Sequence, residues 1–230
     1  MPAVLTPDEW QAVRLTLLVA ARAVGFGLPV AVLAAAAMRR RFPGRAVAEL
    51  VLHLPLVLPP VVTGWLLLLV FGVRGPVGHW LLAWFGVRLA FTTAGASLAC
   101  AVMTFPVMVR AIRLSLDAVD PGLEQAARTL GAGRWDRFRT ITVPLALPGV
   151  LTGAALAYVT SLGEFGAVIT FAADIPGRTR TLPLAIYAAL QSPGGEQAAA
   201  RLSLASVSLA LAGLGAAEWL GRRRLRAGGP

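Results

Sequence analysis

Lysine is absent from the sequence, and all 21 basic residues among its 230 are arginines. An ordinary P-loop places a lysine on the phosphates of a bound nucleotide. The chain therefore cannot carry that nucleotide-binding loop. If it takes part in ATP-driven work, we expect the ATPase to be another polypeptide.

Cysteine and histidine are almost as scarce. Cys100 is the only cysteine and lies in an apolar run, which excludes an internal disulfide and a cysteine-based metal site. His53 and His79 are far apart and lack metal-motif spacing, so we interpret them as ordinary helix or interface residues. We expect no metal and no cofactor. An intramembrane enzyme is also disfavoured, because no paired carboxylates or Ser–His set lies within the apolar runs.

Charge is sparse as well. Only 14% of the residues are charged, against about 25% in ordinary soluble domains. Hydrophobic residues make up 57% of the chain, and its mean hydropathy is +0.72. The net charge of +10 does not indicate a nucleic-acid partner, because the arginines form short clusters beside apolar runs. That distribution is typical of loops that flank helices in membrane lipid.

Five apolar runs approach the roughly 20 residues that a helix needs to cross a bilayer. Backbone polar groups in lipid must be satisfied within the segment, and runs such as 65–70 do not alternate as barrel strands do. We therefore predict an all-α, polytopic membrane protein with a single transmembrane domain over residues 1–230. We expect no removable signal peptide, because no basic segment followed by a cleavage site opens the chain. The predicted spans are 15–38, 47–71, 89–109, 145–171 and 202–220.

The arginines divide unevenly between the two sides that five spans define. One side holds 14 of them, within residues 39–45, 110–139 and 222–226, and the other side holds six. Arginine-rich loops face the cytoplasm. We therefore predict that the N-terminus lies outside, and that the C-terminus and the loop 110–143 are cytoplasmic.

Proline interrupts the second span. Pro55, Pro59 and Pro60 each remove a backbone donor, and each ring clashes with the preceding turn, so we expect a kinked or broken helix. Such a break is compatible with a packing kink and equally with a helix that lines a pathway. Residues 182–190 are apolar but too short to span, and we expect a re-entrant or interfacial helix there on the external face.

The loop 110–143 contains two candidate short helices. Residues 123–130 are rich in helix formers, and Gly131 and Gly133 suit a helix stop and a tight turn. Beyond them, Trp135 and Phe138 are three residues apart, so a helix places both on one face beside arginines. Aromatic residues and arginine dominate interface hot spots. The pattern fits a docking element and equally a helix lying among lipid headgroups.

This loop resembles the EAA loop of ABC importer permeases. In that motif, three residues separate an alanine pair from a glycine, and nine residues separate the glycine from an isoleucine. The matching positions here are Ala126, Ala127, Gly131, Ile141, Val143 and Pro144. Gln125 stands where the family has glutamate, which removes any salt bridge that the glutamate would make, and Val143 stands where leucine is usual. In that family the loop forms coupling helices that dock into a groove on the ATPase. The resemblance implies an ATPase-coupling role for Glu124, Gln125, Ala126, Ala127, Gly131, Arg134, Trp135, Asp136, Phe138 and Pro144.

Three further stretches resemble the molybdate permease branch of the type I importer fold. They are residues 53–62, 161–167 and 192–196, and similarity runs nearly end to end. The resemblance implies an inner-membrane permease with five transmembrane helices, which works by alternating access as a homodimer. It also implies two ATPase subunits, which hydrolyse ATP in place of this chain, and an external oxyanion-binding protein. Sulfate and tungstate permeases are near relatives. A passive channel or secondary transporter is the alternative from another class, and it would need neither this loop nor an ATPase.

Polar residues within the spans are candidates for the translocation pathway. A charge at mid-bilayer costs about 2.5–3.5 kcal/mol on insertion scales, so Glu164 is expected to face protein or water. Because a carboxylate repels an oxyanion, we favour a structural role in which Glu164 pairs with an arginine or with backbone donors. Hydroxyls hold an anion without trapping it, although they also serve in helix–helix hydrogen bonds. The candidate set is Pro59, Pro60, Thr63, Thr160, Ser161 and Glu164.

Overall fold

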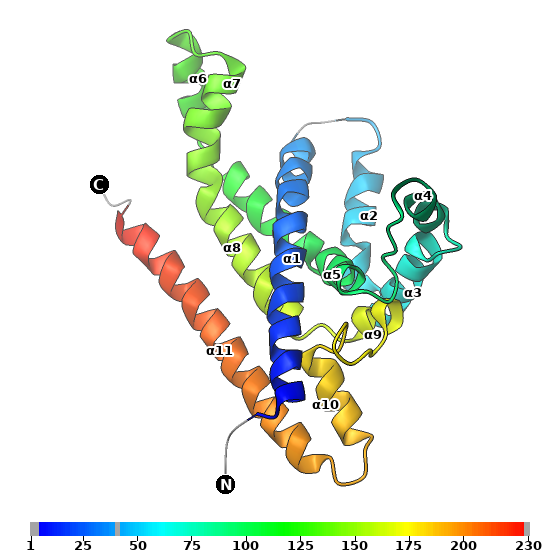
Figure 1. Cartoon of the computed structure of the whole chain (residues 1–230). Coiled ribbons are helices and arrows are strands. Elements are labelled where there is room, and N and C mark those ends of the chain that lie inside the picture. Colours follow the sequence, from blue (N-terminus) through cyan, green and yellow to red (C-terminus); the bar gives the residue numbers. More distant parts are fainter. Residues whose placement is uncertain (1–4, 40–41, 228–230) are drawn as a thin grey trace.

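A computed structural model of the chain describes residues 5–39 and 42–227, without the side chains of residues 121, 124, 134 and 217–227. This part of the chain is helical throughout and contains no strand, as predicted. The elements in Figure 1 are α1 (Pro7–Met38), α2 (Arg45–Val57), α3 (Pro60–Phe71), α4 (Pro76–Phe85), α5 (Thr93–Asp117), α6 (Pro121–Thr129), α7 (Arg134–Arg137), the π-helical turn η1 (Phe138–Thr142), α8 (Val143–Leu162), α9 (Gly166–Ala172), α10 (Leu182–Leu190) and α11 (Glu196–Ala227).

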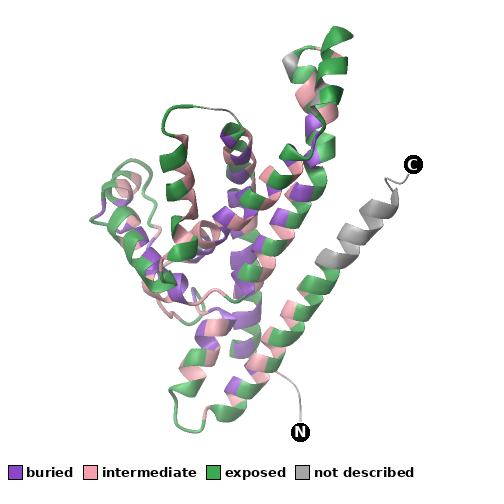
Figure 2. Cartoon of the chain, turned by 180° about the vertical axis from the view of Figure 1, so that it is seen from behind, coloured by how far each residue is buried: buried purple, intermediate pink, exposed green. Residues whose placement is uncertain are grey.

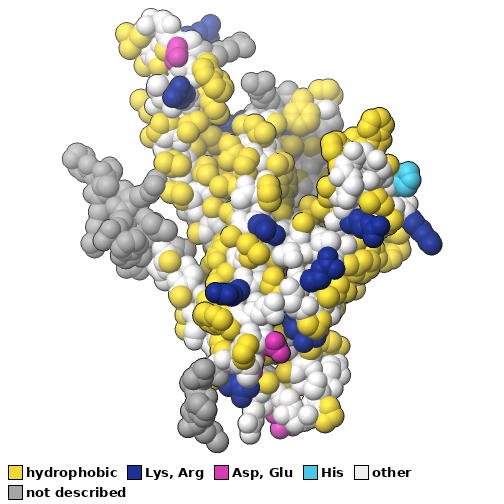
Figure 3. Space-filling view, viewed as in Figure 1, with side chains coloured by type: hydrophobic (Ala, Val, Ile, Leu, Met, Phe, Trp, Pro, Cys, Tyr) yellow, Lys and Arg dark blue, Asp and Glu magenta, His cyan; other side chains and the backbone are white. Residues whose placement is uncertain are grey.

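Four stretches of the described chain are long and apolar enough to cross a membrane. They are α1, α5, the segment Trp135–Leu162, and Glu196–Ala216 of α11; the pair α2 and α3 adds a fifth if it counts as one span. Hydrophobic side chains cover much of the face in Figure 3, with isolated arginines between them. The observed helix limits differ from the predicted span limits where a capping residue sets the start of a helix. Helix α5 begins at Thr93 because the Thr92 hydroxyl accepts a hydrogen bond from the Gly95 amide (3.1 Å).

The second predicted span is broken where its sequence indicated. Helices α2 and α3 meet at an angle of 120°. Leu58 is extended, as favoured before a proline, and Pro60 then opens α3 in the first-turn position that proline tolerates. Pro55, by contrast, lies inside α2 without ending it.

The fourth predicted span, 145–171, is not one helix, and this prediction is wrong in its continuity. Helix α8 ends at Leu162 and α9 begins at Gly166. The Glu164 carboxylate accepts a hydrogen bond from the Ala167 amide at 3.0 Å, which satisfies one of the free donors at the start of α9. Glu164 therefore lies in a break between two helices rather than inside one.

Small residues allow the long helices to pack closely. Ala20, Ala31 and Ala35 of α1 are fully buried. On α8, a Cβ at Gly149 would overlap Ser115 of α5 and lie 2.8 Å from the Ala111 carbonyl oxygen. Small residues are the usual means by which membrane helices approach one another. Figure 2 shows the buried residues along the middle of the bundle, whereas the α6–α7 tip is largely exposed.

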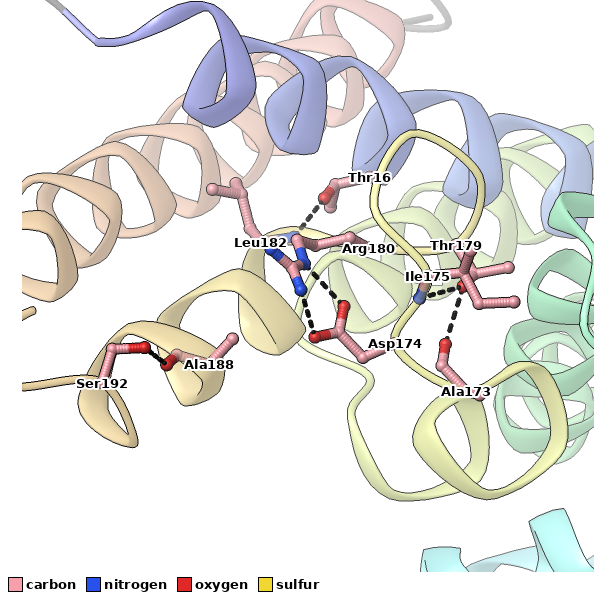
Figure 4. Close-up of polar contacts among 9 residues, drawn as sticks. All are labelled: Thr16, Ala173, Asp174, Ile175, Thr179, Arg180, Leu182, Ala188 and Ser192. Atoms are coloured by element: carbon pink, nitrogen blue, oxygen red, sulfur yellow. Dashed lines mark hydrogen bonds and ion pairs between the residues drawn. The ribbon is translucent and has the colours of Figure 1, made fainter.

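The end of the molecule opposite that tip is fixed by polar contacts (Figure 4). The Leu182 amide at the start of α10 donates to the Thr16 hydroxyl of α1 at 2.7 Å. Arg180 binds both carboxylate oxygens of Asp174 (2.7 and 2.8 Å) within the loop that precedes α10. The short apolar stretch 182–190 is thus a helix attached to α1, too short to span.

The long helices share a polarity. The end of α1, the start of α2, the α6–α7 tip and the end of α11 lie at one end of the bundle (Figure 1). The start of α1 and the α10–α11 connection lie at the other end. The three arginine-rich segments predicted to face one side therefore belong to the same end of the molecule.

Candidate coupling and pathway sites

Helices α6 and α7 protrude beyond the bundle as a helical tip (Figure 1). Asp120 caps α6 by accepting a hydrogen bond from the Gly122 amide at 2.7 Å, with proline in the first turn. Gly131 has a φ of +86°, the left-handed conformation that reverses the chain after a helix. The tip thus has the order of helix, glycine turn and second short helix that the sequence predicts.

The tip carries an aromatic pair. The rings of Trp135 and Phe138 are stacked, with centroids 5.7 Å apart and planes 25° apart. Trp135 is 71% exposed. The helical spacing therefore brings both aromatics to one face, where the Trp135 ring is open and Phe138 is half-buried.

The other predicted coupling residues are distributed along the same tip. Gln125, Ala126 and Asp136 are exposed, and Ala127 is half-buried. Pro144 lies in the first turn of α8. The side chains of Glu124 and Arg134 lie outside the described residues, although their backbones belong to α6 and α7.

The tip is joined to the bundle without an intervening loop. From α7 the chain passes through the π-helical turn Phe138–Thr142 into α8. The Val143 amide donates to the Phe138 carbonyl, and the Thr140 hydroxyl donates to the Asp136 carbonyl at 2.6 Å. The continuous segment Trp135–Leu162 has 28 residues, which at 1.5 Å per residue is about 42 Å of helix. The aromatic pair and the break at Glu164 therefore lie at the two ends of one continuous helical segment.

At the far end of α8 the two helix breaks meet. A Cβ at Gly166 would lie 2.7 Å from the Cβ of Pro60, and a Cβ at Gly64 would lie 2.7 Å from the Ala167 carbonyl oxygen. Helix α3 and helix α9 thus pack backbone against backbone near their first turns. This brings the Pro59–Pro60 break beside the break that contains Glu164. Gly64 and Gly166 are not among the predicted site residues; a glycine within the first two turns after each helix break was the available signal.

The three candidate hydroxyls differ in their surroundings. Thr63 and Ser161 are 5% and 4% exposed, and neither hydroxyl has a hydrogen-bond partner among the described residues. Buried polar atoms without a partner are rare, and each needs an explanation such as a functional role. Thr160 is exposed on the side of α8. No group of three or more His, Cys, Asp or Glu within the described ranges is placed to hold a metal ion.

Comparison with known proteins assigns the chain to a family. Residues 27–226 match the family described as binding-protein-dependent transport system inner membrane component. The molybdenum transport system permease protein ModB of Escherichia coli (strain K12) is 58% identical over 227 residues, covering 98% of this chain and 99% of that protein. ModB of Haemophilus influenzae is 50% identical over 216 residues, covering 94% of each chain.

Solved structures support the same fold. A bacterial alginate ABC transporter, crystallised with an alginate-bound periplasmic protein, contains a chain that superposes with a TM-score of 0.75. The match covers 95% of this chain and 80% of that one at 17% identity, so it speaks for the fold alone. The fold and the family match point to the same assignment. The chain belongs to the family of binding-protein-dependent transport system inner membrane components, and it is a multi-pass membrane subunit of a transport system.

Proposed function

We propose that this chain is the transmembrane permease subunit of an ATP-driven ABC importer for molybdate. The observation that carries the proposal is the exposed Trp135, stacked on the half-buried Phe138, on a tip that continues into a membrane-spanning helix. Identity of 58% to a molybdenum transport permease, over nearly the whole of both chains, supports molybdate as the cargo. In this proposal two copies of the chain form the pathway, and a separate external protein delivers the oxyanion.

The arginine distribution supports the orientation. The end of the bundle that bears the tip carries the arginine-rich segments, and such segments face the cytoplasm. The tip and the C-terminus are then cytoplasmic, and the N-terminus is external. Two ATPase subunits dock on the two tips and hydrolyse the ATP, since the chain has no lysine for a P-loop.

The mechanism is alternating access driven through α8. When the ATPase subunits close on ATP, each moves the tip that it holds, and α8 carries the movement to the break at Glu164. The neighbouring break at Pro59–Pro60 follows because Gly64 and Gly166 leave the first turns of α3 and α9 in backbone contact. The dimeric pathway then opens outward, and it opens inward after hydrolysis.

The pathway residues suit a passing oxyanion. The buried hydroxyls of Thr63 and Ser161 are unused donors within the described chain, and they hold an anion without the fixed charge that would trap it. Glu164 is engaged by the Ala167 amide, so we assign it a structural role at the start of α9 rather than contact with the cargo.

Truncation of the aromatic pair tests the docking claim. We expect Trp135→Ala with Phe138→Ala to abolish copurification of the ATPase and the stimulation of its activity, because hot-spot aromatics carry much of an interface's binding energy. Trp84→Ala is the matched control, since Trp84 is 76% exposed but lies on α4, away from the tip. Copurification and stimulation that equal those of the control would remove the docking role from the pair.

A further inference from the structure

A cavity of about 330 Å³ lies between α1, α2 and α5 at the arginine-rich end of the bundle. Its wall has two kinds of surface. Leu52, Val109 and Leu114 are apolar, whereas Arg110 and Arg113 bring positive charge. The cavity is therefore amphiphilic, with charge and apolar surface in one hollow.

The carboxylates in the wall are already neutralised. Glu49 accepts hydrogen bonds from Arg113 at 2.8 Å and from Arg45 at 3.1 Å. Asp117 forms ion pairs with Arg113 at 3.6 Å and with Arg39 at 3.8 Å. These contacts hold the guanidinium groups in place around the cavity.

Arg110 is the charged group of the wall that remains open to a ligand. It lines the same wall, is exposed and forms no ion pair with any described residue. Arg113 binds both carboxylates of the wall, and Arg45 and Arg39 from outside the cavity bind Glu49 and Asp117, so Arg110 is the arginine of the wall that pairs with neither carboxylate. The charge of the site is complementary to an anion.

The cavity lies at a level of the bundle where lipid headgroups meet the helices. It is formed where α1 and α5 end and α2 begins, and arginines at helix ends mark the membrane interface. Helix α2 has no buried residue, and Leu50 and Val57 on it are 72% and 81% exposed. The helix is apolar on its outer side, so the cavity opens beside surface that suits acyl chains.

We propose that this cavity binds an anionic phospholipid. The phosphate lies on Arg110 and Arg113, and the upper part of an acyl chain lies against Leu52 and Leu114. A basic pocket between membrane helices is a recognised form of headgroup site. A free oxyanion would leave the apolar wall without a partner. None of the residues that line the cavity belongs to the candidate pathway set, and the proposal depends on neither the ATPase nor the cargo.

Native mass spectrometry of the purified full chain, titrated with phosphatidylglycerol or phosphatidylcholine, tests the proposal. We expect phosphatidylglycerol to bind in preference, and Arg110→Gln to weaken it about fivefold, since an arginine near the surface is worth about that factor. Arg88→Gln is the matched control: Arg88 is also exposed and lies outside the cavity. Leu52→Trp should fill the cavity and reduce binding of the same lipid while the charges remain.

Several results would overturn the site. Equal binding of phosphatidylcholine would show that charge plays no part in binding. Equal effects of Arg110→Gln and Arg88→Gln would show that the lipid does not bind in the cavity. Displacement of the lipid by millimolar inorganic phosphate or molybdate would assign the cavity to a free oxyanion instead. A lipid-free dimer that excludes phosphatidylglycerol would assign it to a second copy of the chain. Thermal unfolding of each variant, unchanged from the parent, shows that loss of lipid is not loss of fold.

Discussion

At the scale of single residues, Thr16 is the clearest link between distant parts of the chain. Its hydroxyl donates to the Ala12 carbonyl and accepts from the Leu182 amide, both at 2.7 Å, and the residue is 1% exposed. This hydroxyl is the partner that α1 offers to the first turn of α10 (Figure 4). It thereby fixes the loop 173–181 against the start of the first span.

We predict that Thr16→Val destabilises the protein by about 1–3 kcal/mol, because the buried Leu182 amide loses its acceptor. Thr104→Val is the control: Thr104 is equally buried, but its hydroxyl donates only to carbonyls of its own helix (Cys100 at 2.8 Å). Thermal unfolding in detergent measures both. Equal losses in the two variants would show that the contact between α1 and α10 contributes nothing.

At the scale of elements, the turn at Gly131 sets how α6 and α7 present the aromatic pair. A side chain at Gly131 meets no atom within 4 Å, so only its φ of +86° opposes substitution. Forcing another residue into the left-handed region costs roughly 1–2 kcal/mol. The orientation of the tip is therefore sensitive to the backbone at this one position.

Gly131→Ala is expected to weaken ATPase binding by about five- to thirtyfold, the factor that corresponds to that conformational penalty. Gly133→Ala should have little effect, because Gly133 lacks a positive φ and its Cβ would meet only the Asp136 carboxylate at 3.3 Å. Titration of the ATPase against each variant in nanodiscs gives the affinities. A larger effect at Gly133 than at Gly131 would contradict this account of the turn.

The sequence predicts those features of the fold that neighbouring residues determine. Prolines predicted the break before α3, and the spacing of Trp135 and Phe138 predicted their shared face. The break after α8 escaped prediction because residues 166–172 continue the apolar run, so composition does not distinguish one helix from two. The hydrogen bond that ends the ambiguity, from the Ala167 amide to Glu164, is visible only in three dimensions.

Tertiary contacts account for the rest of what the sequence could not predict. The approach of Gly64 to α9 and the cavity beside Arg110 each join segments far apart in the chain. The π-helical turn at Phe138–Thr142 has no compositional signal either, yet it makes the tip and α8 one continuous element. The pathway hypothesis depends on this continuity, and spacing alone does not establish it.

At the scale of the whole molecule, the proposed orientation is open to direct labelling. Cys100 is the only cysteine in the sequence and is 1% exposed, so a Cys100→Ala background has no native thiol. Leu130→Cys places a thiol on the tip, where Leu130 is 88% exposed, and Gln191→Cys places one after α10 at the opposite end. A membrane-impermeant maleimide added to intact cells should label position 191 and not position 130 until the membrane is opened. Labelling of position 130 in intact cells would invert the topology.

The whole account depends on a permease that moves molybdate only when a docked ATPase drives it. Uptake of labelled molybdate into proteoliposomes, with the binding protein supplied outside and ATP enclosed, measures this directly. We predict accumulation that requires the ATPase and hydrolysable ATP, that is lost with Trp135→Ala and Phe138→Ala, and that excess sulfate does not suppress. Accumulation by the chain without an ATPase would contradict the importer, and suppression by sulfate would contradict the choice of cargo.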